Sequence, residues 1–347
     1  MKKLIVVLSI TLLCIAIVTG CSGRKSSSSS SVVEGDISTH PKVTLKLGGI
    51  EAAEDFFTLA AYKFADMVKE RSKGSITVEV YPASQLGDMP KMFEAVKMGT
   101  QDIVGGSGSY MSQFIPDKAI ETAFFLFEDE AHFLKYVASD LCKQYSEEFT
   151  KKTSVIPLSQ TWIRGPRFFI AKKPLRTAAD FKDLKTRVPD IKGYLKSVEA
   201  LGCKPTMIVW GELYLALLQN VVEAGENAPF ALYAAKFHEA APFLIETVHL
   251  YDSACLYMSE RSFNKLTPAQ KKVVIEADLE AAQYYNKSVR DMTQDCIDKM
   301  IAEGTTFIRK SEIDIATLSK MAKDGAMALE AEGFWSKGLY DKVAAMK

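Results

Sequence analysis

Two short segments of the sequence carry side chains whose types and spacing suit the binding of an organic anion. Arg187 stands at the end of a strand-like run that includes Leu184 and Val188. About forty residues later, Glu226 and Asn227 stand where a second strand-like run turns into a loop. An arginine presents a planar fork of donors that matches a carboxylate, and an asparagine offers both a donor and an acceptor. The two segments therefore predict a carboxylate site, provided that the fold brings them together.

The elements that must position these residues alternate between strand and helix. Residues 42–49 and 75–82 show strand patterns, and residues 58–74 between them place apolar side chains on one helical face. The alternation restarts near residue 154, and a long helical run extends from Thr267 to about Gly304. This order predicts an α/β fold with an open sheet. Two such units joined by crossing strands predict a two-lobed, hinged protein, similar to periplasmic binding proteins, with long C-terminal helices.

The 327 residues that follow residues 1–20 exceed what a single hydrophobic core usually serves, so we expect two domains. We expect lobe I to comprise residues 42–165 and about 253–292, and lobe II residues 166–252 and about 293–347. Ligands of open α/β sheets bind beyond the carboxyl ends of the strands. Arg187 and Asn227 both fall at such ends, so we expect them to line one cleft.

The N-terminus reads as an export signal followed by an attachment site. Residues 1–20 contain two lysines and then an apolar stretch that is short for a membrane span. They end in Val-Thr-Gly before Cys21, which resembles a bacterial lipobox, where the cysteine becomes lipidated. The serine-rich composition of residues 21–41 predicts a flexible tether. The alternatives are an ordinary signal peptide with a chance cysteine, or an uncleaved anchor.

The charged and metal-binding residues exclude several classes of function. The chain has 43 Lys and Arg residues and 43 Asp and Glu residues, without a basic cluster, so no nucleic-acid partner is expected. The histidines and the cysteines beyond Cys21 lack the spacing of a metal site, and we expect no metal and no cofactor. An exported protein is permitted disulfides, but the sequence does not pair Cys142, Cys203, Cys255 and Cys296.

A series of ordered motifs makes the chain similar to a known family. It resembles the solute-binding proteins of tripartite ATP-independent periplasmic (TRAP) transporters, of the dicarboxylate-binding type. The resemblance extends from Val43 to about Val289 and keeps an eighteen-residue step from Arg187 to Pro205. Its motifs lie at residues 82–87, 125–127, 162–175, 184–189, 201–205, 211–217, 225–227 and 236–244.

The resemblance implies an extracytoplasmic protein of the bacterial cell envelope that closes on an organic acid. The acid would be a sugar acid, a dicarboxylate or a keto acid, and it would pass to two integral membrane subunits driven by an ion gradient. In the family, the arginine of the Arg-Val-Pro motif pairs with the ligand carboxylate, and this residue is Arg187. Arg167 matches a second family arginine and Asn227 the binding asparagine, whereas Arg164 is an additional arginine.

Several departures from the family pattern concern the ligand. Sialic-acid binders place polar or charged contacts where this chain has Met89, Ser107 and Tyr110, which argues against sialate, and Tyr110 remains an expected ligand contact. Trp210 and Trp162 would supply an apolar wall for a larger or less polar acid.

Each candidate also has a structural alternative. If they do not bind ligand, Arg187 forms a surface salt bridge, Arg167 forms a structural ion pair, and Asn227 stabilises a turn. Both tryptophans would belong to the core. Glu226 would repel a carboxylate, so we expect it to accept from ligand hydroxyls or to orient an arginine.

The alternative function is a secreted lipoprotein enzyme that acts on a small carboxylate. The run from Gly105 to Ser109 resembles the Gly-x-Ser-x-Gly motif of hydrolases, but Ser109 stands where the closing glycine belongs. A structural or adhesive surface lipoprotein is the third class. Such a protein does not require two arginines and an asparagine at strand ends. The sequence therefore predicts a membrane-tethered receptor and not an enzyme.

Overall fold

The computed structural model describes residues 36–347, which form one compact unit. The predicted signal segment, Cys21 and residues 21–35 of the predicted tether lie outside the described residues. Within that tether, Asp36 pairs with Lys73 at 3.1 Å, and His40 shares a hydrogen bond of 2.7 Å with the Thr267 hydroxyl. Residues 36–41 therefore contact the folded body.

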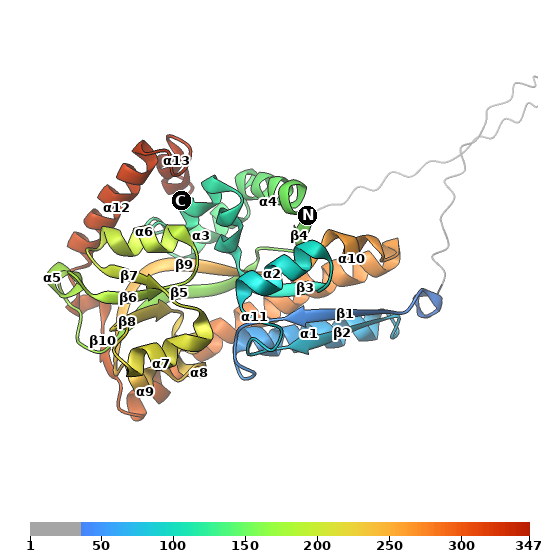
Figure 1. The fold of residues 1–347 in the computed structure, drawn as a ribbon, viewed down its shortest axis with the longest axis horizontal. Coiled ribbons are helices and arrows are strands. Elements are labelled where there is room, and N and C mark those ends of the chain that lie inside the picture. The colour runs from blue at the N-terminus through green and yellow to red at the C-terminus, as the bar shows by residue number, and fades with distance from the viewer. Residues whose placement is uncertain (1–35) are drawn as a thin grey trace, which may run out of the picture. The chain divides into compact units, whose positions relative to one another are not determined.

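A single mixed sheet of ten strands organises the described part of the chain (Figure 1). Its strands are β1 (Val43–Gly48), β2 (Ile76–Tyr81), β3 (Ile103–Ser107), β4 (Val155–Pro157), β5 (Trp162–Ala171), β6 (Lys185–Val188), β7 (Lys204–Met207), β8 (Ala224–Asn227), β9 (Phe243–Ser259) and β10 (Thr306–Ile308). The strand order is β2-β1-β3-β9-β5-β8-β6-β7, with β4 and β10 also paired to β9. The predicted α/β class is confirmed.

Two long strands connect the two halves of the sheet. One end of β9 pairs with β3 and β4, and its other end pairs with β10, while β5 pairs with β9 in an antiparallel manner along both halves. Parallel pairs flank them on either side, β1 with β2 and β6 with β7. These are the crossing strands that the sequence predicts, whereas the lobe boundaries stay a prediction, because residues 36–347 form one unit.

Helices cover the sheet and complete the core. They are α1 (Phe56–Arg71), α2 (Met89–Met98), α3 (Glu130–Val137), α4 (Asp140–Thr153), α5 (Ala178–Phe181), α6 (Lys192–Ala200), α7 (Leu213–Leu218), α8 (Pro229–Ala234), α9 (Phe237–Ala240), α10 (Glu260–Asn264), α11 (Pro268–Ala302), α12 (Ile315–Ala331) and α13 (Leu339–Ala344). None of these helices combines the length and the apolar character that a membrane span requires.

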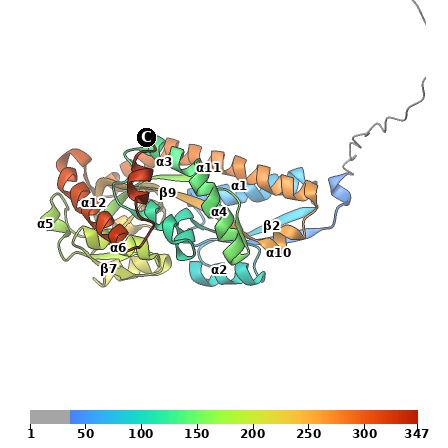
Figure 2. The ribbon, with the colours of Figure 1, turned by 90° about the horizontal axis from the view of Figure 1, so that it is seen from above.

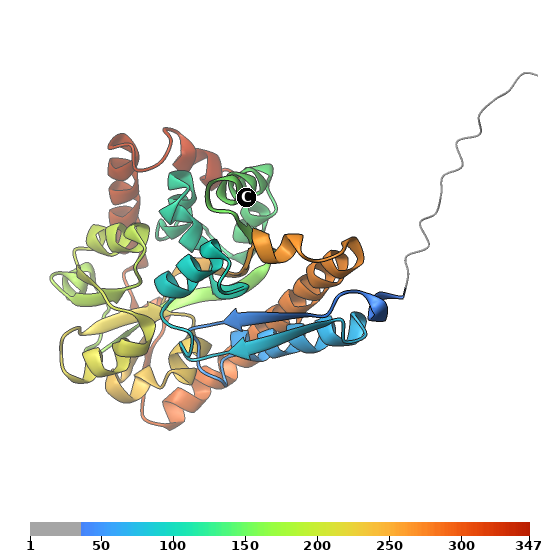
Figure 3. The same ribbon diagram turned by 45° about the vertical axis from the view of Figure 1, so that its right-hand side comes forward.

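Helix α11 is the long C-terminal helix that the sequence predicts. Thr267 and Gln270 form a capping box at its start, and Pro268 occupies its first turn, where a missing N–H costs nothing. The helix packs against α1 and β5 and, further along, against α8, so it supports both halves of the sheet (Figures 2 and 3). The four cysteines between residues 36 and 347 are buried and free.

A bulge in β5 decides which side chains face the cleft. In a regular strand, side chains three residues apart point to opposite faces. Around Arg164, β5 contains one extra residue relative to β9, and the following Gly165 adopts φ +74°, which favours glycine.

Replacing Gly165 should therefore destabilise the protein through its backbone. A Cβ atom there would meet Val289 Cγ1 at 3.4 Å, an ordinary contact, so the positive φ is the source of the cost. We expect Gly165→Ala to lower the free energy of unfolding by about 1–2 kcal/mol in urea denaturation. Gly211→Ala is the control, because that site is open and lacks a positive φ. Equal stability of both variants would contradict this account of the bulge.

Candidate functional site

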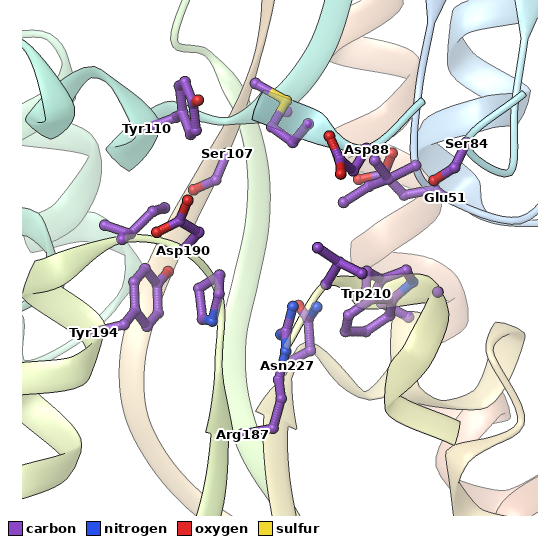
Figure 4. A pocket seen from close by; sticks show the side chains of 18 of the residues that line it. Glu51, Ser84, Asp88, Ser107, Tyr110, Arg187, Asp190, Tyr194, Trp210 and Asn227 are labelled. Atoms are coloured by element: carbon purple, nitrogen blue, oxygen red, sulfur yellow. The ribbon is translucent and has the colours of Figure 1, made fainter. Parts of the chain in front are cut away.

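A cavity of about 350 Å³ lies between the two halves of the sheet, at the carboxyl ends of β1, β3, β6 and β8. Figure 4 shows its side chains pointing inward from both sides. The strand ends thus meet as the sequence predicts. The lining includes five expected contacts, namely Arg187, Arg167, Asn227, Trp210 and Tyr110, together with Ile50, Glu51, Ser84, Asp88, Met89, Pro90, Gly106, Ser107, Arg164, Pro189, Asp190, Ile191, Tyr194, Val209, Gly211, Glu212, Ala231 and Asp252.

Arg187 is a buried cation without an acidic partner among the described residues. It stands on β6, is 4% exposed, and donates from Nε to the Ile208 carbonyl at 2.8 Å. Its guanidinium carbon lies 5.4 Å from the centroid of the Trp210 ring. Burial, in part offset by Glu226, lowers the pKa of Arg187 to about 10. Its two terminal nitrogens are therefore available for an anion in the cavity.

Asn227 lies beside Arg187 at the end of β8 (Figure 4). Its Oδ1 accepts a hydrogen bond of 2.8 Å from the backbone N–H of Ala228. This bond fixes the side chain and leaves the amide nitrogen, which has no partner among the described residues, as a donor toward the cavity. Arg187 and Asn227 together present adjacent donors on one wall.

Arg167 is held by two acidic side chains. Its Nε and Nη2 donate to the two carboxylate oxygens of Glu226 at 2.6 and 2.7 Å, and its Nη1 donates to Asp252 at 3.0 Å. Burial alone would raise the pKa of Glu226, but Arg167 and His249 hold that pKa well below its usual range. The guanidinium of Arg167 also lies 5.1 Å from the Tyr194 ring centroid. The geometry gives Arg167 the structural ion pair that was its alternative, at the edge of the cavity.

The ion pairs continue toward the other half of the sheet. Arg164 donates to Glu51 at 2.8 Å and lies 3.8 Å from Asp252, which it shares with Arg167. We call this row the charge ladder, and its members are Glu51, Arg164, Asp252, Arg167 and Glu226. At its end, burial lowers the pKa of His249, so the neutral ring faces Glu226 at 3.3 Å.

Trp210 and Tyr110 stand where the sequence places them, on the cavity. Trp210 packs edge-on against Phe237, with ring centroids 4.7 Å apart, and presents its face to Arg187. Tyr110 packs against Phe93 at 5.0 Å, and burial raises the pKa of its phenol, which stays a hydrogen-bond donor. The cavity therefore has one aromatic wall beside Arg187 and a phenol across from it.

Two expected contacts do not line the cavity. Trp162 is completely buried, packs against Phe57 and Tyr285, and donates to Asp278 at 3.0 Å, so the expectation of a pocket wall is corrected to a core position. Glu226 is also completely buried, behind the lining. Of its two expected roles, the orientation of an arginine is the one that its contacts provide.

The sequence interpretation missed several acidic and hydroxyl side chains on the cavity. Glu51, Ser84, Asp88, Asp190 and Tyr194 all line it. Glu51 follows the glycines that end β1, so the rule that places ligands at strand ends would have found it. Between residues 36 and 347, no cluster of side chains is suited to a metal ion.

Comparison with known proteins shows the family of the chain. Residues 47–328 match the model of the bacterial extracellular solute-binding proteins, family 7. The chain belongs to this family. The predicted resemblance to TRAP solute-binding proteins and the predicted two-lobed fold are thereby confirmed.

Solved relatives share the fold over most of the chain. A TRAP periplasmic solute-binding protein from Ochrobacterium anthropi, with bound L-fuconate, is 31% identical to this chain and has a TM-score of 0.82. The match covers 88% of this chain and 99% of that chain. The protein from Polaromonas sp. JS666, bound to D-erythronate, is 27% identical with the same TM-score and coverage. The 2,3-diketo-L-gulonate-binding periplasmic protein YiaO of Escherichia coli is 27% identical over 76% of this chain and 80% of its own length.

The two central arginines should differ in their effect on stability. Arg167→Met leaves the buried Glu226 without a cationic partner and Asp252 with Arg164 alone, so we expect it to lower the free energy of unfolding by about 3–5 kcal/mol. Arg187→Met removes a buried, unpaired charge, and we expect stability within about 1 kcal/mol of the wild type. Chemical denaturation of the ligand-free proteins measures both, and the two variants serve as each other's control. Equal losses in the two variants would contradict the assignment of separate roles.

Proposed function

We propose that this protein is an extracytoplasmic receptor that captures a small organic acid and delivers it to the membrane subunits of a TRAP transporter. The observation that carries the proposal is Arg187, a buried cation that lines the cavity without an acidic partner among the described residues. A carboxylate bound there would form the bidentate, charge-assisted pair that the guanidinium lacks. Asn227 would donate to the same carboxylate.

The electrostatics of the site support the capture of an anion. Burial lowers the pKa of Arg187 because its charged form is poorly compensated, and an anion in the cavity would provide the compensation. The cavity of about 350 Å³ lies at the lower end of the range for small-molecule sites, which fits a small acid. Because residues from both halves line it, closure of the two halves would enclose the acid.

The ligands of relatives point to a hydroxylated acid. The solved relatives described above carry L-fuconate and D-erythronate, and a third, from Roseobacter denitrificans, carries L-galactonate. Each of these is a monocarboxylate with several hydroxyl groups. A sugar acid is therefore the ligand class that we propose for this chain.

The receptor function is favoured over the enzyme alternative. The relatives are named as binding proteins, and a hydrolase of the serine type would require a serine paired with a histidine. The four histidines instead have other partners: His40 contacts Thr267, His132 contacts the Glu128 N–H and the Val343 carbonyl, His238 contacts Glu303, and His249 contacts Thr247 and Glu226. Ser107 in the Gly-x-Ser-like run donates to Asp252.

Binding measurements test the role of Arg187 directly. We expect isothermal titration to show binding of L-fuconate or D-erythronate by the wild type and loss of about 2–5 kcal/mol of binding free energy in Arg187→Met. The neutral sugar L-fucose should not bind. Lys185→Met is the matched control, because Lys185 is an exposed cation on the same strand. If neutral sugars bind as well as acids, or if Arg187→Met binds acids normally, the proposal is wrong.

We also propose that a lipid on Cys21 tethers the receptor to the outer face of a membrane. The lipobox-like sequence before Cys21 supports this attachment. In cell fractionation, we expect the wild type in the membrane fraction and Cys21→Ser outside it, because the variant lacks the acyl acceptor. Cys142→Ser is the matched control, since Cys142 is a buried thiol. Identical fractionation of wild type and Cys21→Ser would refute the anchor.

A further inference from the structure

The two facing walls of the cavity have opposite chemistry. Arg187 and Asn227 supply donors on one wall (Figure 4). Glu51, Ser84 and Asp88 gather on the wall across the cavity, and these side chains are acceptors or a hydroxyl. A ligand whose carboxylate reaches Arg187 therefore directs its other end toward carboxylates.

Glu51 is held in place but is only half satisfied. It is 3% exposed and lines the cavity, and one of its oxygens, Oε1, accepts from Arg164 at 2.8 Å. The other oxygen, Oε2, is buried and has no hydrogen-bond partner among the described residues. A buried carboxylate oxygen without a donor is costly, and a donor on the ligand would remove that cost.

We propose that Glu51 accepts a hydrogen bond from a hydroxyl group at the far end of the ligand, and that it makes the receptor selective for hydroxylated monocarboxylates over dicarboxylates. This inference rests on the proposed function, because it assumes that a carboxylate occupies Arg187. Arg164 already balances the charge of Glu51, so Oε2 requires a neutral donor rather than a second cation.

A second carboxylate at this wall would meet like charges. Asp88 lines the same cavity; its Oδ1 accepts from the backbone N–H of Lys91 at 3.0 Å, and its Oδ2 lies 3.8 Å from the exposed Lys91 ammonium. Near Glu51 the ionised form of another carboxyl group is disfavoured. Burial, followed by the charge of Glu51, raises the pKa of Asp55 to about 7. A dicarboxylate would place its second charge in the same field, without a free cation among the described residues of that wall.

The test compares acids of equal length that differ only at the far end. D-erythronate and meso-tartrate form one pair, and L-galactonate and galactarate form the other; in each pair the terminal CH2OH group of the first acid is a carboxylate in the second. In isothermal titration of the wild type, we expect the hydroxylated monocarboxylate to bind at least about tenfold more tightly in whichever pair binds. Equal or tighter binding of the dicarboxylates would overturn the inference without any variant.

Glu51→Gln assigns the selectivity to one residue. The glutamine keeps an oxygen for Arg164 and turns an amide donor toward the cavity. The affinity for the monocarboxylate should therefore fall about ten- to hundredfold, whereas the affinity for the dicarboxylate should rise. Glu54→Gln is the matched control, an exposed glutamate in the same loop, and should bind as the wild type does.

The possible results separate this inference from the proposed function. If the wild type binds acids through Arg187 but Glu51→Gln keeps the wild-type preference, the inference is wrong and the receptor function stands. If the wild type binds none of the four acids and no other organic acid, the proposed function fails and the inference fails with it. If a zwitterionic amino acid binds more tightly than every hydroxylated acid, the role of Oε2 as acceptor for a neutral hydroxyl is refuted.

Discussion

The cavity depends on the charge ladder that runs from Glu51 to Glu226. Its two arginines and three carboxylates are each at most 5% exposed, and removing five charges from water is tolerated only because each arginine lies between two acids. The ladder joins the loop after β1 to β8 through β5 and β9. It therefore connects the two walls of the cavity, and the bulge at Gly165 is what lets both arginines reach Asp252.

Arg167 and Arg187 show how partners decide the role of the same residue type. Arg167 donates its hydrogen bonds to Glu226 and Asp252, and these two carboxylates raise its pKa despite burial. Arg187 has a backbone carbonyl and an aromatic ring instead, and burial lowers its pKa. Since the ladder already occupies the nearby acids, Arg187 is the buried cation that remains for a ligand among the described residues of the cavity.

Much of the fold was predictable, and so was one wall of the site. The alternating patterns gave the α/β class and α11, and the strand-end rule brought Arg187 and Asn227 together. The position of Trp162 was not predictable, because β5 is buried on both faces and its periodicity cannot say which face meets the cavity. The ladder was not predictable either, since a bulge that inverts the alternation of side chains depends on tertiary pairing.

The contact between Trp210 and Arg187 gives the protein an optical reporter of its own cavity. The chain has three tryptophans, and two of them, Trp162 and Trp335, are at most 3% exposed in the core. Trp210 alone faces the cavity, 5.4 Å below a guanidinium whose charge a bound carboxylate would neutralise. A change of tryptophan fluorescence on ligand addition, excited at a wavelength that tyrosine does not absorb, would therefore come mainly from this indole, and Trp210→Phe would remove it. Unlabelled receptor would then allow capture and release to be followed in real time.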